Sequence, residues 1–176
     1  MLKRFWVSAA AIAATALLGT SPASAVLTGS AGGSTIFVQN RADNAPAVTG
    51  VVGFVDIPGA NVVVTVPAGA SRLVTARITG ESLCIGAAAV AGRWCSVRVI
   101  VTNTVSGASQ ELNPVAGLDF AFDTVTNPND LFESNAIERS IRLGPGTYRV
   151  RGQYGVSFNG VSFRLDDWHF RVDLNF

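Results

Sequence analysis

The sequence predicts an all-β protein that folds as a two-sheet antiparallel sandwich, and three observations support this. From Thr35 to the C-terminus, apolar and polar residues alternate with a period of two, as they do along a half-buried strand. Gly, Pro, Asn and Asp interrupt these runs at short intervals, and no segment keeps a helical period. We expect a jelly-roll-like topology, with an immunoglobulin-like sandwich as the alternative.

The first 25 residues have the pattern of a secretory signal peptide. Lys3 and Arg4 give a positive start, an apolar run covers Phe5–Leu18, and a small-residue cleavage site ends at Ala25. The apolar run is shorter than the about 20 residues of a membrane span, which disfavours an uncleaved anchor. We expect a signal peptide over 1–25, a flexible lead-in over 26–34 and a single domain over 35–176, secreted and extracellular or attached to the cell surface. No later stretch of the mature chain is apolar enough to span a membrane.

Nine segments have the alternation of strands and are separated by turn residues. In order, they are Thr35–Gln39, Gly50–Ile57, Asn61–Val66, Ser71–Thr79, Cys95–Asn103, Leu118–Asp123, Phe132–Leu143, Thr147–Phe158 and Val161–Phe176. Within Thr147–Phe158 the even positions are mostly apolar, whereas Arg149, Arg151 and Gln153 point the other way. One face of this strand is therefore expected to pack and the other to contact water.

The last two segments carry the most specific local signals. Asn159-Gly160 joins two alternating runs through two residues, which predicts a type I′ hairpin. In the final segment the apolar residues change phase, from odd positions up to Leu165 to even positions from Trp168 onward. Because a slip of one residue turns every later side chain to the opposite face, the chain must absorb one extra residue near Asp166-Asp167, as a β-bulge or a change of sheet.

Charge and cysteine content narrow the function classes. Without its leader the chain has 11 arginines, no lysine and 12 acidic residues, and this near-neutral balance argues against a nucleic-acid partner. The chain has two cysteines, Cys84 and Cys95, and is expected to enter an oxidising compartment. An even number of cysteines there favours a disulfide between them. The 10 residues between the two cysteines are too few for the bridge of a true immunoglobulin domain.

Oxygen-bearing side chains gather in one segment with the composition of a calcium loop. The candidate ligands are Asp119, Asp123, Asn127, Asn129 and Asp130, with Glu133 nearby. Calcium takes six to eight oxygen ligands on a turning loop, but the spacing here does not match an EF-hand, and a solvated Asn-Pro turn is the alternative. Calcium is the only cofactor that the sequence suggests.

Other chemistry-bearing residues give weaker signals. Trp94, in a Gly-rich segment, is the aromatic residue expected to be partly exposed, and with Asp166 and Asp167 it is a candidate ligand-binding residue. Asp167 and the single histidine, His169, share a strand face, but no nucleophile elbow accompanies them. An aromatic platform for sugars and paired carboxylates for sugar hydrolysis remain alternatives to core packing and solvated turns; they would draw on Trp94, Tyr148, Tyr154 and Trp168, and on Asp119, Asp123, Glu133, Glu138 and Asp166.

Several short motifs resemble a group of uncharacterised secreted bacterial β-sandwich proteins. They are Glu81-Ser82-x-Cys84, Trp94-Cys95-Ser96-Val97-Arg98, Asp119-Phe120-Ala121-Phe122-Asp123, Glu138-Arg139-Ser140, Pro145-Gly146-Thr147-Tyr148 and Phe163-Arg164-Leu165-Asp166-Asp167-Trp168. The resemblance covers roughly residues 50–176, and it implies a shared sandwich and a Cys84–Cys95 bridge. It carries no known activity and transfers no catalytic residue.

Taken together, these patterns predict a secreted, non-catalytic β-sandwich that binds a glycan or an envelope protein, or that helps to build the cell surface. The first alternative is a secreted hydrolase that uses carboxylates; it requires a concave pocket where at least two acids converge. The second is a self-assembling or strand-adding envelope subunit, which requires a long uncovered edge strand.

Overall fold

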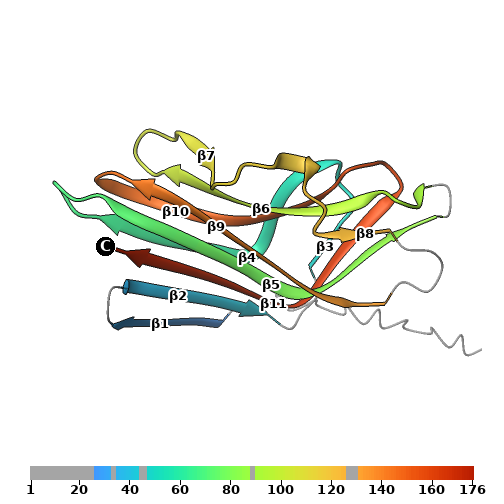
Figure 1. The fold of residues 1–176 in the computed structure, drawn as a ribbon, viewed down its shortest axis with the longest axis horizontal. Helices are drawn as coiled ribbons and strands as arrows, with labels where there is room; N and C mark the ends of the chain where they lie inside the picture. Colours follow the sequence, from blue (N-terminus) through green and yellow to red (C-terminus); the bar gives the residue numbers. More distant parts are fainter. Residues whose placement is uncertain (1–25, 33–34, 44–46, 88–89, 126–130) are drawn as a thin grey trace, which may run out of the picture.

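A computed structural model describes residues 26–32, 35–43, 47–87, 90–125 and 131–176, which form two antiparallel sheets (Figure 1). Sheet A has the order β1-β2-β11-β5-β9, with β3 also paired to β11; sheet B has the order β4-β10-β6-β7, with β8 also paired to β6. The strands of sheet A are β1 (Val26–Gly32), β2 (Thr35–Asp43), β3 (Ala47–Thr49), β5 (Arg72–Gly86), β9 (Glu133–Leu143) and β11 (Val161–Asn175). Those of sheet B are β4 (Gly53–Val66), β6 (Trp94–Asn103), β7 (Ser109–Glu111), β8 (Asp123–Thr124) and β10 (Gly146–Val156), and a short 3-10 helix, η2, covers Gly117–Asp119.

The connections give the sandwich a jelly-roll topology. From β4 onward the long strands alternate between the sheets: β4, β6 and β10 belong to sheet B, whereas β5, β9 and β11 belong to sheet A. Leaving out the added strands β1, β3 and β8, each sheet holds four strands, as in an eight-stranded jelly roll. The predicted all-β, two-sheet antiparallel sandwich is therefore confirmed.

The predicted hairpin at Asn159-Gly160 is wrong. Strand β10 lies in sheet B and β11 in sheet A, so the turn between them crosses from one sheet to the other instead of pairing two neighbours. Gly160 has φ +81°, whereas Asn159 is not among the positive-φ residues, so the turn is not type I′. A dipeptide identifies a tight turn, but it does not tell whether the strands on either side pair with each other.

The predicted bulge in the last strand is confirmed. Asp166 pairs with Glu81 and His169 with Thr79, so β11 uses one more residue than β5 over this interval. Asp167 takes the extra position with φ +42°, a left-handed conformation that Asp tolerates better than most residues. Gly80 lies opposite, where an added Cβ would come within 3.0 Å of the Leu165 and Trp168 side chains. The bulge thus leaves little room for a side chain at position 80.

Side chains from both sheets fill the interior. On β11 the buried residues are Val161, Phe163 and Leu165 before the bulge, and Trp168, Phe170, Val172 and Leu174 after it. The Cys84–Cys95 disulfide, with Cα atoms 5.7 Å apart, joins β5 of sheet A to β6 of sheet B. The predicted bridge is confirmed, and it connects the two layers.

Three segments differ from the strand boundaries that the sequence suggests. Val26–Gly32 forms β1 and pairs with β2, where we expected a lead-in before the first strand. Strand β4 runs through Pro58-Gly59, because Gly59 adopts φ +82° and an edge strand tolerates a proline without an N–H. Leu118–Asp123 is not one strand but contains η2 and the start of β8.

The expected signal peptide lies outside the described residues. Within the described residues, no helix is long and apolar enough to span a membrane.

Candidate functional site: a groove on the outer face of sheet B

Strand β10 positions the polar side chains of the candidate site. Val150, Tyr154 and Val156 are buried in the core, and the alternation turns Arg149 and Arg151 to the outer face of sheet B. Because β10 lies between β4 and β6, its outward side chains contact polar groups from both neighbours. The strand pattern predicted this orientation, but not the partners that the neighbouring strands supply.

A hydrogen-bonded ladder crosses the outer face of sheet B through four strands. Arg151 Nη1 donates to both carboxylate oxygens of Asp56 on β4, at 3.1 and 2.8 Å, and Gln153 Nε2 donates to Asp56 Oδ1 at 2.7 Å. Arg98 Nε on β6 donates to Gln153 Oε1 at 2.8 Å, and Arg98 Nη1 lies 3.4 Å from Glu111 Oε2 on β7. The ladder holds both arginines and both carboxylates in fixed positions.

The β7 end of the ladder has further support. The guanidinium of Arg98 stacks 4.1 Å from the centre of the Phe54 ring, and Glu111 Oε1 accepts the backbone N–H groups of Ala116 and Gly117 at 3.2 and 3.3 Å. All the charged groups in this part of the face therefore have partners, which points to a structural role for Arg98 and Glu111.

Two depressions flank Arg149 and Arg151 and together form the groove. One, of about 340 Å³, is lined by residues of β6 and the turn after it; the other, of about 350 Å³, is lined by Asp56–Asn61 of β4. Both depressions share Arg149 and Arg151 as lining residues. The first also contains Thr102, Asn103, Thr104 and Gly107. The two depressions are open, and residues of β4, β6 and β10 line them.

Arg149 is the exception in this well-paired face. Its side chain is exposed and makes no hydrogen bond or ion pair with any residue that the structure describes. Arg151, two residues along, is bound by Asp56 and also donates to Thr102 Oγ1 at 3.2 Å. The groove therefore has one compensated cation and one uncompensated cation.

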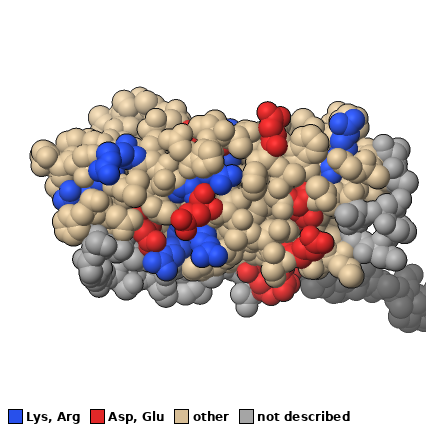
Figure 2. Space-filling view, viewed as in Figure 1, with Lys and Arg blue, Asp and Glu red and all other residues tan. Residues whose placement is uncertain are grey.

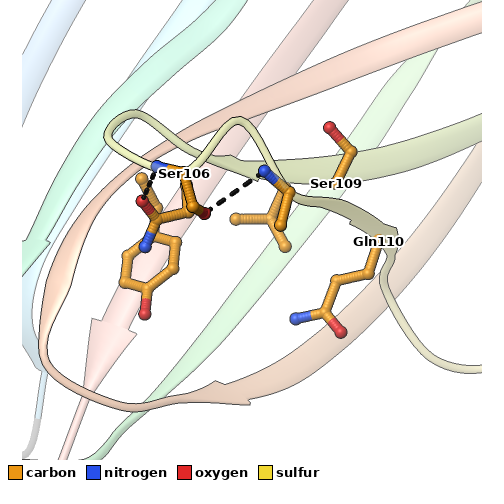
Figure 3. Close-up of a pocket in the computed structure, with 7 residues that line it drawn as sticks. Ser106, Ser109 and Gln110 are labelled. Atoms are coloured by element: carbon orange, nitrogen blue, oxygen red, sulfur yellow. Dashed lines mark hydrogen bonds between the residues drawn. The ribbon is translucent and has the colours of Figure 1, made fainter.

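A third depression, of about 260 Å³, lies at the β6–β7 turn (Figure 3). Its lining includes Tyr148, Asn103, Ser106 and Gln110. Asn103 Oδ1 accepts the backbone N–H groups of Val105 and Ser106, and Ser106 Oγ accepts that of Ala108, so these acceptors hold the turn itself. The hydroxyl of Tyr148 donates to Gly144 O at 3.1 Å. These polar groups serve the loop, which makes this depression the weaker site.

The three predicted ligand-binding residues do not meet at one place. Trp94 begins β6, is half-buried and donates its indole N–H to Leu118 O, so it is held in place instead of projecting from a loop. Asp166 forms an ion pair with Arg164 at 3.2 Å and accepts the N–H of Asp167. Asp167 lines a depression of about 400 Å³ beside Glu81 on sheet A. Tyr154 and Trp168 are buried, so they add nothing to a platform.

The predicted calcium ligands that the structure describes do not form one site either. Asp119 is exposed in η2, whereas Asp123 is half-buried and accepts hydrogen bonds from Ser82 Oγ and from the N–H of Thr124 at 2.8 and 2.7 Å. Burial raises the pKa of Asp123, against the effect of the Ser82 hydrogen bond. Among the described residues no three acidic, His or Cys side chains gather around a common point, and Asn127, Asn129 and Asp130 lie outside the described residues. Calcium binding remains a prediction.

Acidic pairs for sugar hydrolysis are also poorly arranged. Asp123 is the acid whose pKa is raised, but it is bound to Ser82 and lines none of the four depressions. The acids that do share a depression, Glu81 and Asp167, are both exposed. On the face shown in Figure 2, basic side chains lie mainly on the left, with acidic ones among them, and several acidic side chains gather right of the centre.

His169 lies on the outer face of sheet A without the carboxylate that a catalytic dyad needs. Partial burial, followed by the nearby Arg171 and Arg77 guanidinium groups, lowers the pKa of His169 from its ordinary value of 6.5. No acid contributes to this shift, and Asp173 is bound to Arg171 at 2.9 and 3.0 Å. The arrangement favours a neutral imidazole.

We expect His169 to make the fold less stable as the pH falls. Because its pKa is lower in the folded state, the stability it contributes is complete above pH 6.5 and is lost as the pH falls through the folded pKa. Urea unfolding at pH 7.5 and 5.5 should therefore show a smaller difference for His169→Gln than for the native chain. Equal differences in the two proteins would show that the imidazole does not titrate in this way.

The comparisons with known proteins come from solved structures. No protein-family model matches the chain, and neither does any curated protein at the threshold applied. Similar structures include the CBM22-1 xylan-binding domain from Paenibacillus barcinonensis Xyn10C, with 13% identity, a TM-score of 0.32 and coverage of 92% of this chain and 85% of that one. Another is the module CBM6cm-2 from Cellvibrio mixtus lichenase 5A in complex with cellotriose, with 14% identity, a TM-score of 0.26 and coverage of 89% and 88%.

Proposed function

We propose that this chain is a non-catalytic, extracellular glycan-binding β-sandwich whose binding surface is the groove on the outer face of sheet B. The observation that carries the proposal is the pair of adjoining depressions that share Arg149 and Arg151. Their lining combines guanidinium, hydroxyl, amide and main-chain groups on rigid strands. Sugar hydroxyls both donate and accept hydrogen bonds, so a mixed lining of this kind suits them.

The rigidity of the groove supports a binding role. Asp56, Arg151 and Gln153 are already held by the ladder, so a ligand would order few side chains when it binds. Preorganisation of this kind lowers the entropy cost of association. A catalytic role has less support, because no described acid lines this groove except Asp56, which is bound by Arg151 and Gln153.

The test is retardation of the protein in native gels that contain soluble polysaccharides of different composition. We expect at least one polymer to retard the native chain, and Thr104→Trp to abolish that retardation, because the indole would fill the groove from an exposed position. Ser134→Trp, at an exposed position on β9 of sheet A, is the control and should bind like the native chain. Equal retardation of both variants would place binding elsewhere, and no retardation by any polymer would contradict the proposal.

A further inference from the structure

We infer that the groove takes an acidic glycan, one whose residues carry carboxylate groups as uronic acids do, and that Arg149 binds the carboxylate. This inference rests on the proposed function and adds the chemical class of the ligand. It follows from the charges in the groove, from the geometry that the groove already displays, and from the neutral groups beside Arg149.

Among the charged side chains that line the groove, Arg149 is the one without a partner of opposite charge in the part of the chain that the structure describes. Three ionisable side chains line the groove: Asp56, Arg149 and Arg151. Asp56 is already shared by Arg151 and Gln153, so its negative charge is not available to Arg149. The next carboxylate on this face, Glu111, is bound to Arg98 and to two backbone N–H groups. A ligand with a negative group would complete the pairing of the face.

The geometry favours a carboxylate as that group. Arg149 and Arg151 are alternate residues of one strand, which places their Cα atoms roughly 7 Å apart on the same face. Arg151 already binds a carboxylate through Nη1 at 3.1 and 2.8 Å, so this face accommodates a planar acid against a guanidinium. The Arg149 guanidinium has the same donors, and none of them bonds to a side chain that the structure describes.

The neighbours of Arg149 suit a sugar and not a general polyanion. Thr102 pairs with Arg149 across the sheet, and Asn103, Thr104 and Gly107 continue the lining. These groups are neutral, and hydrogen bonds to neighbouring groups hold the Asn103 and Thr104 side chains in fixed positions. The formal net charge of the whole chain is only +1, so diffuse attraction of polyanions is weak. One uncompensated arginine is also far fewer than the several cations that a nucleic acid requires.

The experiment uses one polymer in two charge states. Isothermal titration compares de-esterified polygalacturonate with the same polymer fully methyl-esterified, and adds dextran sulfate and neutral dextran. We expect the native chain to bind the de-esterified form about tenfold more tightly than the esterified form, as charged hydrogen bonds of this type allow. Arg149→Gln should remove that preference, and 0.5 M salt should weaken it.

The matched control is Arg142→Gln, which removes an exposed arginine from the outer face of sheet A and should keep the preference. Equal binding of both charge states, with no effect of Arg149→Gln, would overturn this inference and leave glycan binding standing. If dextran sulfate binds as tightly as polygalacturonate, the groove recognises anions in general and not carboxylates in particular, which overturns the inference. Binding of none of the polymers used here or in the gels would remove the proposed function together with the inference.

Discussion

Deletion of Asp167 should leave the fold intact, whereas deletion of Arg171, four residues later in the same strand, should unfold the protein or come close to it. Asp167 is the extra residue of the bulge, so its removal lets Trp168 face Gly80 and keeps His169 opposite Thr79. Every buried residue of β11 stays on the inner face. We expect a change in unfolding free energy within about 1 kcal/mol, as for substitutions that disturb no buried group.

After deletion of Arg171, no shift of the chain keeps all the buried residues of β11 on the inner face. If the chain after it slips, Val172 and Leu174 turn outward and Asp173 turns into the core. Burial of each of these apolar side chains contributes about 1.5–3 kcal/mol, and an unpaired buried carboxylate adds a further penalty. If the bulge is used up instead, Trp168 and Phe170 turn outward, which costs more because both are buried aromatic side chains with larger areas than Val172 and Leu174.

Urea unfolding of the two deletion variants, followed by tryptophan fluorescence, measures the difference. An expected gap of at least 3 kcal/mol between them separates a bulge from ordinary strand. Equal losses would mean that the extra residue at Asp167 has a structural task beyond the change of phase, for example in bending β11.

The bulge was predictable because its signal is local. The apolar residues occupy odd positions up to Leu165 and even positions from Trp168 onward. Only one extra residue between them lets both groups face the core. The hairpin at Asn159-Gly160 failed for the opposite reason. Whether two consecutive strands pair or belong to different sheets depends on the whole topology, and here a jelly roll sends β10 and β11 to opposite layers.

For the candidate site, too, the local pattern was predictable and the long-range contacts were not. The alternation of β10 correctly turned Arg149, Arg151 and Gln153 away from the core. Asp56, the partner of Arg151 and Gln153, is 95 residues from Arg151 in sequence, and nothing near Asp56 indicates that contact. The sequence pointed to Trp94 as partly exposed, and its side chain is half-buried. The sequence did not indicate that the carbonyl of Leu118, 24 residues away, holds its indole in place. Groove composition therefore depends on long-range register, which residue patterns alone do not supply.

The disulfide links the two sheets in addition to closing a short loop. Cys84 and Cys95 are both fully buried, and their bond ties the ends of β5 and β6 across the two layers. Near this point β5 contacts few residues of β6 other than through the bond, because the two strands belong to different sheets. The bond thus fixes how the layers align at the end of the sandwich that holds Trp94.

Cys84→Ala/Cys95→Ala should lower the unfolding free energy by about 3 kcal/mol, because the unfolded chain regains the entropy of a closed loop with a sequence separation of 11. For a domain of this size the thermal midpoint should fall by roughly 6–12 °C. Calorimetry of the native chain with and without reductant supplies the control, since reduction should reproduce the loss in the native chain and leave the double variant unchanged. An unaltered midpoint in the double variant would show that packing alone aligns the two sheets, and the bridge would then have little influence on stability.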